Sequence, residues 1–208
     1  MSRPALDVPF PAQRVLVVDV ESSGLDPYAD RLISIGAIEV IGGVIHLDSA
    51  FEVVLRQERA SAEENILVHH IGGSAQLAGR DPADGLLDFL SCAGKVPLVA
   101  FRADFDRVLI ERAMKAALGM KPDNRWLDLA LIAPAVLGGP GRASLDDWLL
   151  RFGIENYDRH DAVADALATA QLLLVVMAAA TERGIATWAG LASIQEDRRW
   201  LQRAGPMV

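Results

Sequence analysis

The chain contains an apolar strand that ends in two carboxylates and a glycine turn. Residues 15–18 form a continuous apolar run, Asp19 and Glu21 follow it, and Gly24 lies in the turn beyond. Side chains alternate faces along a strand, so the two acids, two residues apart, lie on the same face. Two like charges on one patch are unfavourable unless they are solvated, share a proton or bind a cation such as Mg²⁺. The segment is therefore either a solvated strand end or part of a metal site, and other acids must decide.

The composition indicates a folded domain with an acidic surface. The 208 residues are 51% hydrophobic and carry a net charge of −8 at pH 7. This charge argues against a broad basic surface for duplex nucleic acid, but a narrow site stays open because bound metal ions supply positive charge locally. The single cysteine, Cys92, excludes an internal disulfide, and residues 1–5 lack the apolar run of a secretory signal. We expect a cytoplasmic protein without a membrane partner, since the longest apolar run, 172–180, is too short to span a bilayer.

The first third of the chain has the pattern of an antiparallel sheet. After the strand at residue 15, residues 32–41 have strand composition, and two glycines predict a hairpin into residues 44–46. A further apolar strand at 51–55 is expected to continue it. Three sequential strands without an intervening helix favour an antiparallel meander.

The remainder alternates between helices and strands. Short apolar strands are predicted near residues 96–101 and 125–127. The helix after Asp128 ends either at Pro134 or at the glycines 138–139. The other predicted helices cover residues 63–70, 82–92, 104–118, 144–152 with a Ser144 capping box, and 160–181. This order predicts an α/β fold with one mixed sheet flanked by helices.

Two further acids lie where packing alone would not place them. Asp106 follows the strand near residue 100 by half a turn of helix, and Asp165 lies in an otherwise apolar helix. A solvated helix face explains Asp106 by itself, but acids in so apolar a helix as that of Asp165 seldom lie buried without a partner. His160 precedes Asp165 by five residues, so both reach one site only if His160 lies at or before the helix start. Asp161 shares a face with Asp165, and spacing alone does not choose between Asp161 and His160.

Taken in order, these segments resemble the motifs of the DnaQ-like, or DEDD, 3′→5′ exonucleases, the family of the proofreading subunit of bacterial replicative DNA polymerase. Residues 19–24, Asp-Val-Glu-Ser-Ser-Gly, resemble the first motif, Asp-x-Glu-Thr-Thr-Gly. Phe105-Asp106 resembles the second, and His160 with Asp165 matches the histidine form of the third. The tyrosine form needs Tyr at position 161, where this chain has Asp161. The resemblance, which runs from Val15 to Ala178, implies the histidine subclass and a ribonuclease H-like mixed five-stranded sheet flanked by helices.

The resemblance also implies a metal site and a general base. Two Mg²⁺ or Mn²⁺ ions, about 4 Å apart, would activate a water and stabilise the leaving 3′-oxygen. Their ligands would be the carboxylates of Asp19, Glu21, Asp106 and Asp165. His160 would accept the proton of the water, because imidazole can do so near neutral pH.

Substrate contacts follow from the same resemblance. Ser22, Ser23 and Gly24 would line the pocket for the terminal nucleotide, where glycine allows close approach of the backbone. Relatives carry a polar His-Asn pair where this chain has Phe101-Arg102, so the grip on that nucleotide is expected to differ. Arg102 is the candidate for a phosphate contact instead.

Two functions remain open from the sequence. The favoured one is a metal-dependent 3′→5′ exonuclease that shortens single-stranded ends, of DNA more than of RNA, to nucleoside monophosphates. The other is a non-catalytic relative that binds nucleic acid or a DNA polymerase subunit, but the presence of all five signature residues favours the enzyme. We expect an arm at residues 1–13, an exonuclease domain at 14–183 and a C-terminal helical extension at 184–208.

Overall fold

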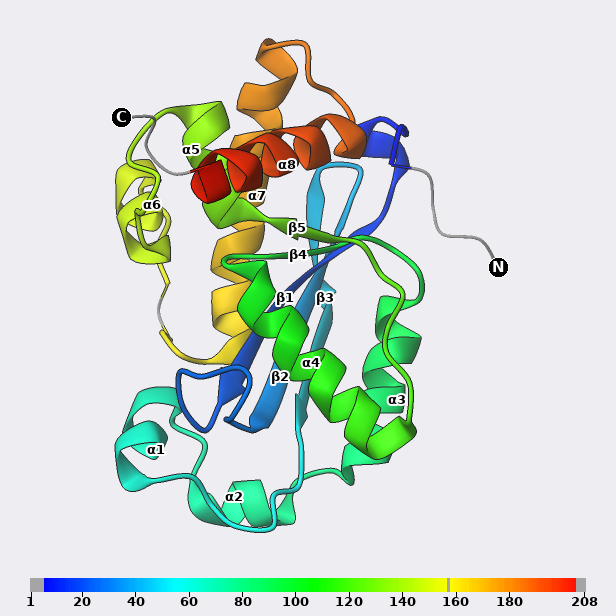
Figure 1. The fold of residues 1–208 in the computed structure, drawn as a ribbon, viewed down its shortest axis with the longest axis vertical. Coiled ribbons are helices and arrows are strands. Elements are labelled where there is room, and N and C mark those ends of the chain that lie inside the picture. Colours follow the sequence, from blue (N-terminus) through cyan, green and yellow to red (C-terminus); the bar gives the residue numbers. More distant parts are fainter. Residues whose placement is uncertain (1–5, 157, 205–208) are drawn as a thin grey trace.

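The computed structural model describes residues 6–156 and 158–204 and contains one five-stranded sheet. The strand order is β3-β2-β1-β4-β5. β1, β2 and β3 pair antiparallel, whereas β4 pairs parallel with β1, and β5 pairs parallel with β4. The predicted antiparallel opening and mixed sheet are confirmed (Figure 1). The strands are β1 (Val15–Ser22), β2 (Leu32–Ile41), β3 (Val44–Val54), β4 (Leu98–Ala100) and β5 (Trp126–Asp128).

Helices cover both faces of the sheet, because side chains of β1 alternate between two hydrophobic cores. Val15 and Val17 belong to a core built with α5, α7 and α8, whereas Leu16 and Val18 belong to a core built with α3 and α4. Figure 1 shows α1 and α2 together at the end of the molecule remote from α8. The helices are η1 (Phe10–Ala12), α1 (Glu63–His69), α2 (Gly73–Ala78), α3 (Pro82–Ala93), α4 (Ala103–Leu118), α5 (Leu129–Leu137), α6 (Leu145–Phe152), α7 (Ala162–Glu182) and α8 (Trp188–Ala204).

Some boundaries differ from the sequence-based prediction for local reasons. α2 was not predicted, because its six residues are too few to show a helical period. β3 is one strand rather than two short ones. α5 continues through Pro134 and ends at Gly138. α7 begins at Ala162 rather than at residue 160, because His160 is left-handed (φ 65°) and the Asp161 side chain caps the helix.

α7 has the length and apolar composition of a membrane-spanning helix. The expectation from the sequence rested on the run 172–180 alone, which is shorter than this helix. Its best 18-residue window is 56% buried inside the protein. The helix contacts β1, β2 and β3 on one side and α5 and α6 on others. Its apolar composition is therefore explained by packing within the core.

The N-terminal segment of the described chain packs against the start of α8. Pro9 forms a bridge with Thr187, and the Phe10 N–H donates to the Ala186 carbonyl at 2.9 Å. The rings of Phe10 and Trp188 meet edge to face, with 5.0 Å between their centroids. The predicted boundaries at residues 13 and 183 stay a prediction, and their outer parts, 1–5 and 205–208, lie outside the described residues.

Gly36 on β2 allows α7 to begin directly against the sheet. It pairs with Asp19 across the β1–β2 ladder. A Cβ atom at this position would lie 2.2 Å from the carbonyl carbon of Ala162 and 2.4 Å from the backbone nitrogen of Val163. Only glycine accommodates this approach, which brings the first turn of α7 over the strand that carries Asp19.

Candidate active site

All five residues assigned chemistry from the sequence line one cleft of about 460 Å³. β1 contributes Asp19 and Glu21, and the first turn of α4 contributes Asp106. His160 precedes α7, and Asp165 lies in its first turn. The parallel pairing of β1 with β4 explains the meeting, because α4 starts at the same edge of the sheet where β1 ends.

The donor set in this cleft fits a divalent cation. One ligand atom each from Glu21, His160 and Asp165 can be chosen so that all lie within 4.8 Å of one another. Glu21, Asp106 and Asp165 are buried, with exposed fractions of 8%, 4% and 4%. Carboxylate oxygens suit Mg²⁺ or Mn²⁺, and buried acids so close together need a compensating charge.

Burial first, and neighbouring acidic groups second, raise the pKa values of three carboxyl groups in the cleft. Burial, followed by the charges of Asp106, Asp165 and Glu21, raises the pKa of Asp19 well above its usual range. Burial, followed by Asp165 and Asp161, raises the pKa of Glu21 to about 8. Burial, with Asp128 nearby, raises the pKa of Asp106 to about 8. In the absence of a cation the cleft therefore holds protons that free carboxylates would lose.

These raised pKa values predict that the metal-free protein loses stability as pH rises. Glu21 and Asp106 keep their protons in the folded state up to about pH 8, whereas the unfolded chain loses them near 4.5 and 3.8. The folded state is thus favoured at low pH, and its advantage declines between these limits. We expect the melting temperature in EDTA to fall from about pH 5 to about pH 8, and millimolar Mg²⁺ to remove most of that fall.

Thermal melts followed by circular dichroism check this, with Asp106→Asn as the comparison. That variant has one titrating group fewer and should show a shallower decline. A melting temperature in EDTA that does not change with pH would contradict the raised pKa values.

His160 lies in a strained turn just before α7. Its backbone is left-handed (φ 65°) and its side chain is exposed. Its N–H donates to Oδ2 of Asp165 at 3.3 Å, which ties the turn to that acid. The neighbouring Asp161 accepts from the Ala164 N–H at 2.9 Å as the helix cap. The two rivals from the sequence therefore differ: His160 lines the cleft, and the Asp161 side chain bonds to the backbone of α7.

Arg159 is a further residue of the site that the sequence did not reveal. Its guanidinium forms an ion pair with Asp165 through Nη1 and another with Asp146 on α6, Nε to Oδ1, at 2.8 Å. Asn156 donates to the second oxygen of Asp165. Nothing in spacing or periodicity marks Arg159, because its partners lie six residues ahead and thirteen residues behind it. In the metal-free site this guanidinium supplies the positive charge beside the acids.

We predict that Arg159→Gln binds Mn²⁺ about 5- to 10-fold more tightly than the unaltered protein, since the cation no longer competes with a guanidinium for Asp165. The metal-free variant should melt at a lower temperature, because Asp165 loses its partner. Isothermal titration with Mn²⁺ measures the affinity. Arg159→Lys, which keeps the charge, is the matched control and should remain near the unaltered protein. Weaker Mn²⁺ binding by Arg159→Gln would show that the guanidinium supports the metal site instead.

Arg102 and Phe101 line the cleft beside Asp106. Arg102 has a left-handed backbone (φ 65°) at the start of α4, and its N–H donates to Oδ1 of the buried Asp128 at 2.9 Å. The same Asp128 oxygen accepts from the Ala130 N–H at 2.9 Å and so caps α5. The exposed Arg102 side chain is thereby held over the cleft by its own backbone.

The three remaining predicted residues shape a loop at the edge of the cleft. The Ser22 hydroxyl donates to the Gly24 carbonyl at 2.6 Å, and the Ser23 hydroxyl donates to Asp30 at 3.1 Å. A Cβ on Gly24 would lie 2.4 Å from the Asp30 carboxylate, so the loop closes tightly. Among the described residues lining the cleft, the loop contributes Leu25 rather than the two serines.

Comparisons with known proteins place the chain in a family. A family model described as an exonuclease, RNase T, matches residues 16–173. The chain is 28% identical over 185 residues to a DNA polymerase III subunit epsilon-like protein of Rhodobacter capsulatus, over 88% of this chain and 26% of that protein. It is 31% identical over 171 residues to a PolC-type DNA polymerase III of Bacillus subtilis, over 82% of this chain and 12% of that protein. The chain thus spans only a minor part of these curated relatives.

Solved structures share the fold. Exonuclease I of E. coli in complex with a dT13 oligonucleotide superposes with a TM-score of 0.70 at 18% identity, over 81% of this chain and 42% of that chain. Exonuclease X in complex with 5′ overhanging duplex DNA gives 0.67 at 19% identity, over 87% of this chain and 99% of that chain. The ribonuclease H-like fold predicted from the motifs is confirmed.

Proposed function

Because the chain belongs to the exonuclease family described by the RNase T model, we propose that it hydrolyses single-stranded nucleic acid from the 3′ end and releases nucleoside monophosphates. The observation that carries the proposal is the convergence in one cleft of four carboxylates and His160 from three separate parts of the chain. If Asp19 and Glu21 were only a solvated strand end, no further acids would be expected beside them. Asp106 and Asp165 nevertheless lie in the same cleft, and both are buried.

The proposed cofactor is a pair of Mg²⁺ or Mn²⁺ ions. Asp19, Glu21, Asp106 and Asp165 would hold them, and the raised pKa values of the first three support a site that binds added positive charge. Such ions supply a nucleophilic water and stabilise charge on the phosphodiester oxygens.

The side chains of the chain itself would perform three tasks. The exposed imidazole of His160, beside the acids, would accept the proton of the attacking water. Arg102 would contact a phosphate of the substrate at the mouth of the cleft. The loop of Ser22, Ser23 and Gly24, with Leu25 at its edge, would form the wall against which the terminal nucleotide lies.

Partners and setting follow from the relatives. The names of the two curated relatives are those of DNA polymerase III proteins, so a polymerase subunit is the partner we propose, in the cytoplasm. DNA is proposed as the preferred substrate over RNA for the same reason. Within the chain, residues 14–183 are proposed as the catalytic unit, with the arm and the C-terminal helix as additions that pack on its core.

Incubation of the purified protein with 5′-labelled DNA and RNA oligonucleotides, with and without Mg²⁺, tests the proposal. We expect a metal-dependent ladder of strands shortened from the 3′ end and nucleoside monophosphate as the product. A strand with a blocked 3′ terminus is the matched control and should remain intact. Binding of the strand without shortening in either metal would support the non-catalytic alternative instead.

A further inference from the structure

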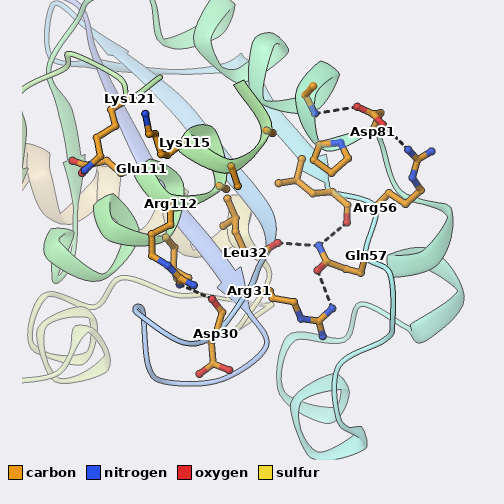
Figure 2. Close-up of a pocket in the computed structure, with 17 residues that line it drawn as sticks. Asp30, Arg31, Leu32, Arg56, Gln57, Asp81, Glu111, Arg112, Lys115 and Lys121 are labelled. Carbon is orange, nitrogen blue, oxygen red and sulfur yellow. Dashed lines mark hydrogen bonds and ion pairs between the residues drawn. The ribbon is translucent and has the colours of Figure 1, made fainter. Parts of the chain in front are cut away.

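A second and larger groove lies beside the active-site cleft. It has a volume of about 970 Å³ and is formed by α4 with Lys121 beyond it, the start of β2, the residues that follow β3, and the start of α3. Figure 2 shows Arg31, Arg56, Arg112, Lys115 and Lys121 around it, on α4, on the segment that follows α4 and on the segments that face it. None of the tasks proposed for the active-site cleft uses the residues of this groove.

The groove is locally positive in an acidic chain. Five cationic side chains line it, against the three acids Asp30, Asp81 and Glu111. Two of these acids are already paired, Asp81 with Arg56 and Glu111 with Lys121. The third carboxylate, that of Asp30, accepts from the Ser23 hydroxyl at 3.1 Å and from the Asp26 N–H at 2.9 Å within its own loop. A groove with surplus positive charge stands out in a protein whose net charge is −8.

Three cations of the groove contact only neutral acceptors within the described residues. Arg31 donates to the Gln57 side chain at 3.2 Å and to the Arg59 carbonyl at 2.7 Å. Arg112 donates to the carbonyls of Pro27 and Asp30 at 2.6 and 2.8 Å, and Lys115 donates to that of Gly119 at 3.2 Å. These contacts fix the positions of the cations without neutralising them, so their charge remains available to an anionic partner.

The floor of the groove is apolar. It contains the buried Leu32, Leu55 and Leu109 and small residues of α4 such as Ala113 and Ala117. None of the described side chains that line it is aromatic. Bases would therefore pack on aliphatic surface, and most of the affinity for a nucleic acid would come from phosphates, without sequence preference.

The groove and the active-site cleft are lined by two shared elements, α4 and the loop between β1 and β2. The loop between β1 and β2 presents Leu25 to the cleft and Asp30 and Arg31 to the groove. α4 carries Asp106 in the cleft and Ala113 in the groove, seven residues on, on nearly the same face of the helix and about 10 Å along it. At a phosphate spacing of at least about 3.4 Å, about two to three nucleotides bridge that distance.

We propose that this groove binds the part of the single strand that lies upstream of the 3′-terminal nucleotides. The proposal rests on the proposed function, because the cleft holds the end that is cut. The apolar floor faces the bases, while Arg31, Arg112 and Lys115 face the phosphates. The groove thus makes long strands better substrates than short ones.

The test compares Lys115→Glu with Lys95→Glu. Both side chains are exposed and both changes alter the net charge equally, but Lys95 lies before β4, at the opposite end of that strand from the cleft. Affinity for labelled oligothymidylates of about 16 nucleotides is measured at several salt concentrations in an Asp106→Asn background, which blocks hydrolysis. We expect Lys115→Glu to weaken binding about 5- to 10-fold and to reduce the salt slope by about 0.7, and Lys95→Glu to change neither by more than about twofold.

A second readout separates failure of the groove from failure of the proposed activity. Hydrolysis of a thymidine dinucleotide, too short to reach the groove, is measured with Asp106 intact and should be equal in both charge variants. Absent hydrolysis in every protein would refute the exonuclease, whereas equal binding of the long strand by both variants would refute the groove. If Lys115→Glu loses affinity for an oligoglutamate peptide but binds the long strand as tightly as the unaltered protein, the groove is a site for an acidic peptide and the proposal is wrong.

Discussion

Replacing Asp106 with asparagine is expected to lower hydrolysis of a single-stranded oligonucleotide on the order of 10³-fold while the fold stays intact. Asp106 is 4% exposed and lies in the first turn of α4, facing the other acids. Asparagine keeps its shape but removes the charge that a divalent cation needs. Because burial already holds the pKa of Asp106 at about 8, loss of the carboxylate costs the metal-free fold little. Steady-state rates, melting temperatures and Mn²⁺ titrations measure the three effects.

Asp104→Asn is the matched control for this variant. Asp104 lies in the same turn of α4 and undergoes the same chemical change, but its side chain is 59% exposed and pairs with Arg107 and Arg199 at the surface. Surface ion pairs contribute at most about 1 kcal/mol, so this variant should keep its activity. Near-normal activity in Asp106→Asn would remove Asp106 from the metal site.

The sheet could be predicted because its signals are local. Runs of apolar residues marked β1 and β2, and the glycines at 42–43, both with positive φ, marked the hairpin into β3. The Ser144 capping box was also predicted from sequence, and the structure shows both of its hydrogen bonds. Strand and helix patterns repeat every two to about four residues, so a short stretch of sequence is enough to predict each element. The α/β fold class was therefore predicted from residues close in sequence.

Features that depend on tertiary contact could not be predicted in this way. In the sequence, Gly36 is only a residue of low strand propensity. Its role becomes clear in the structure, where the backbone of Ala162 lies against it. Arg159 looks like a surface residue, yet it pairs with the buried Asp165. The choice between His160 and Asp161 as a neighbour of the acids depended on where α7 begins, and helix boundaries are set by capping contacts.

The second large effect is expected at His160. His160→Ala should lower the hydrolysis rate by about 10²-fold or more, the usual contribution of general acid–base catalysis. Binding of Mn²⁺ and of a single strand should change little, since four carboxylates remain. The rate of the unaltered protein should fall at low pH, because imidazolium cannot accept a proton, and raising the pH should partly rescue the variant through hydroxide. Rates across the pH range, together with Mn²⁺ titration, check this.

Asp161→Asn is the control that the structure supplies for His160→Ala. Asparagine is as good a helix cap as aspartate, so the hydrogen bond to the Ala164 N–H and the start of α7 should be retained. If Asp161 were the general base, this variant would show the rate loss and His160→Ala would not.

The closeness of His160 to Glu21 and Asp165 permits one further outcome, in which His160→Ala loses Mn²⁺ affinity together with activity. That result would make the imidazole a metal ligand rather than a base, because a base that only accepts the proton of the water leaves the affinity for the cation unchanged.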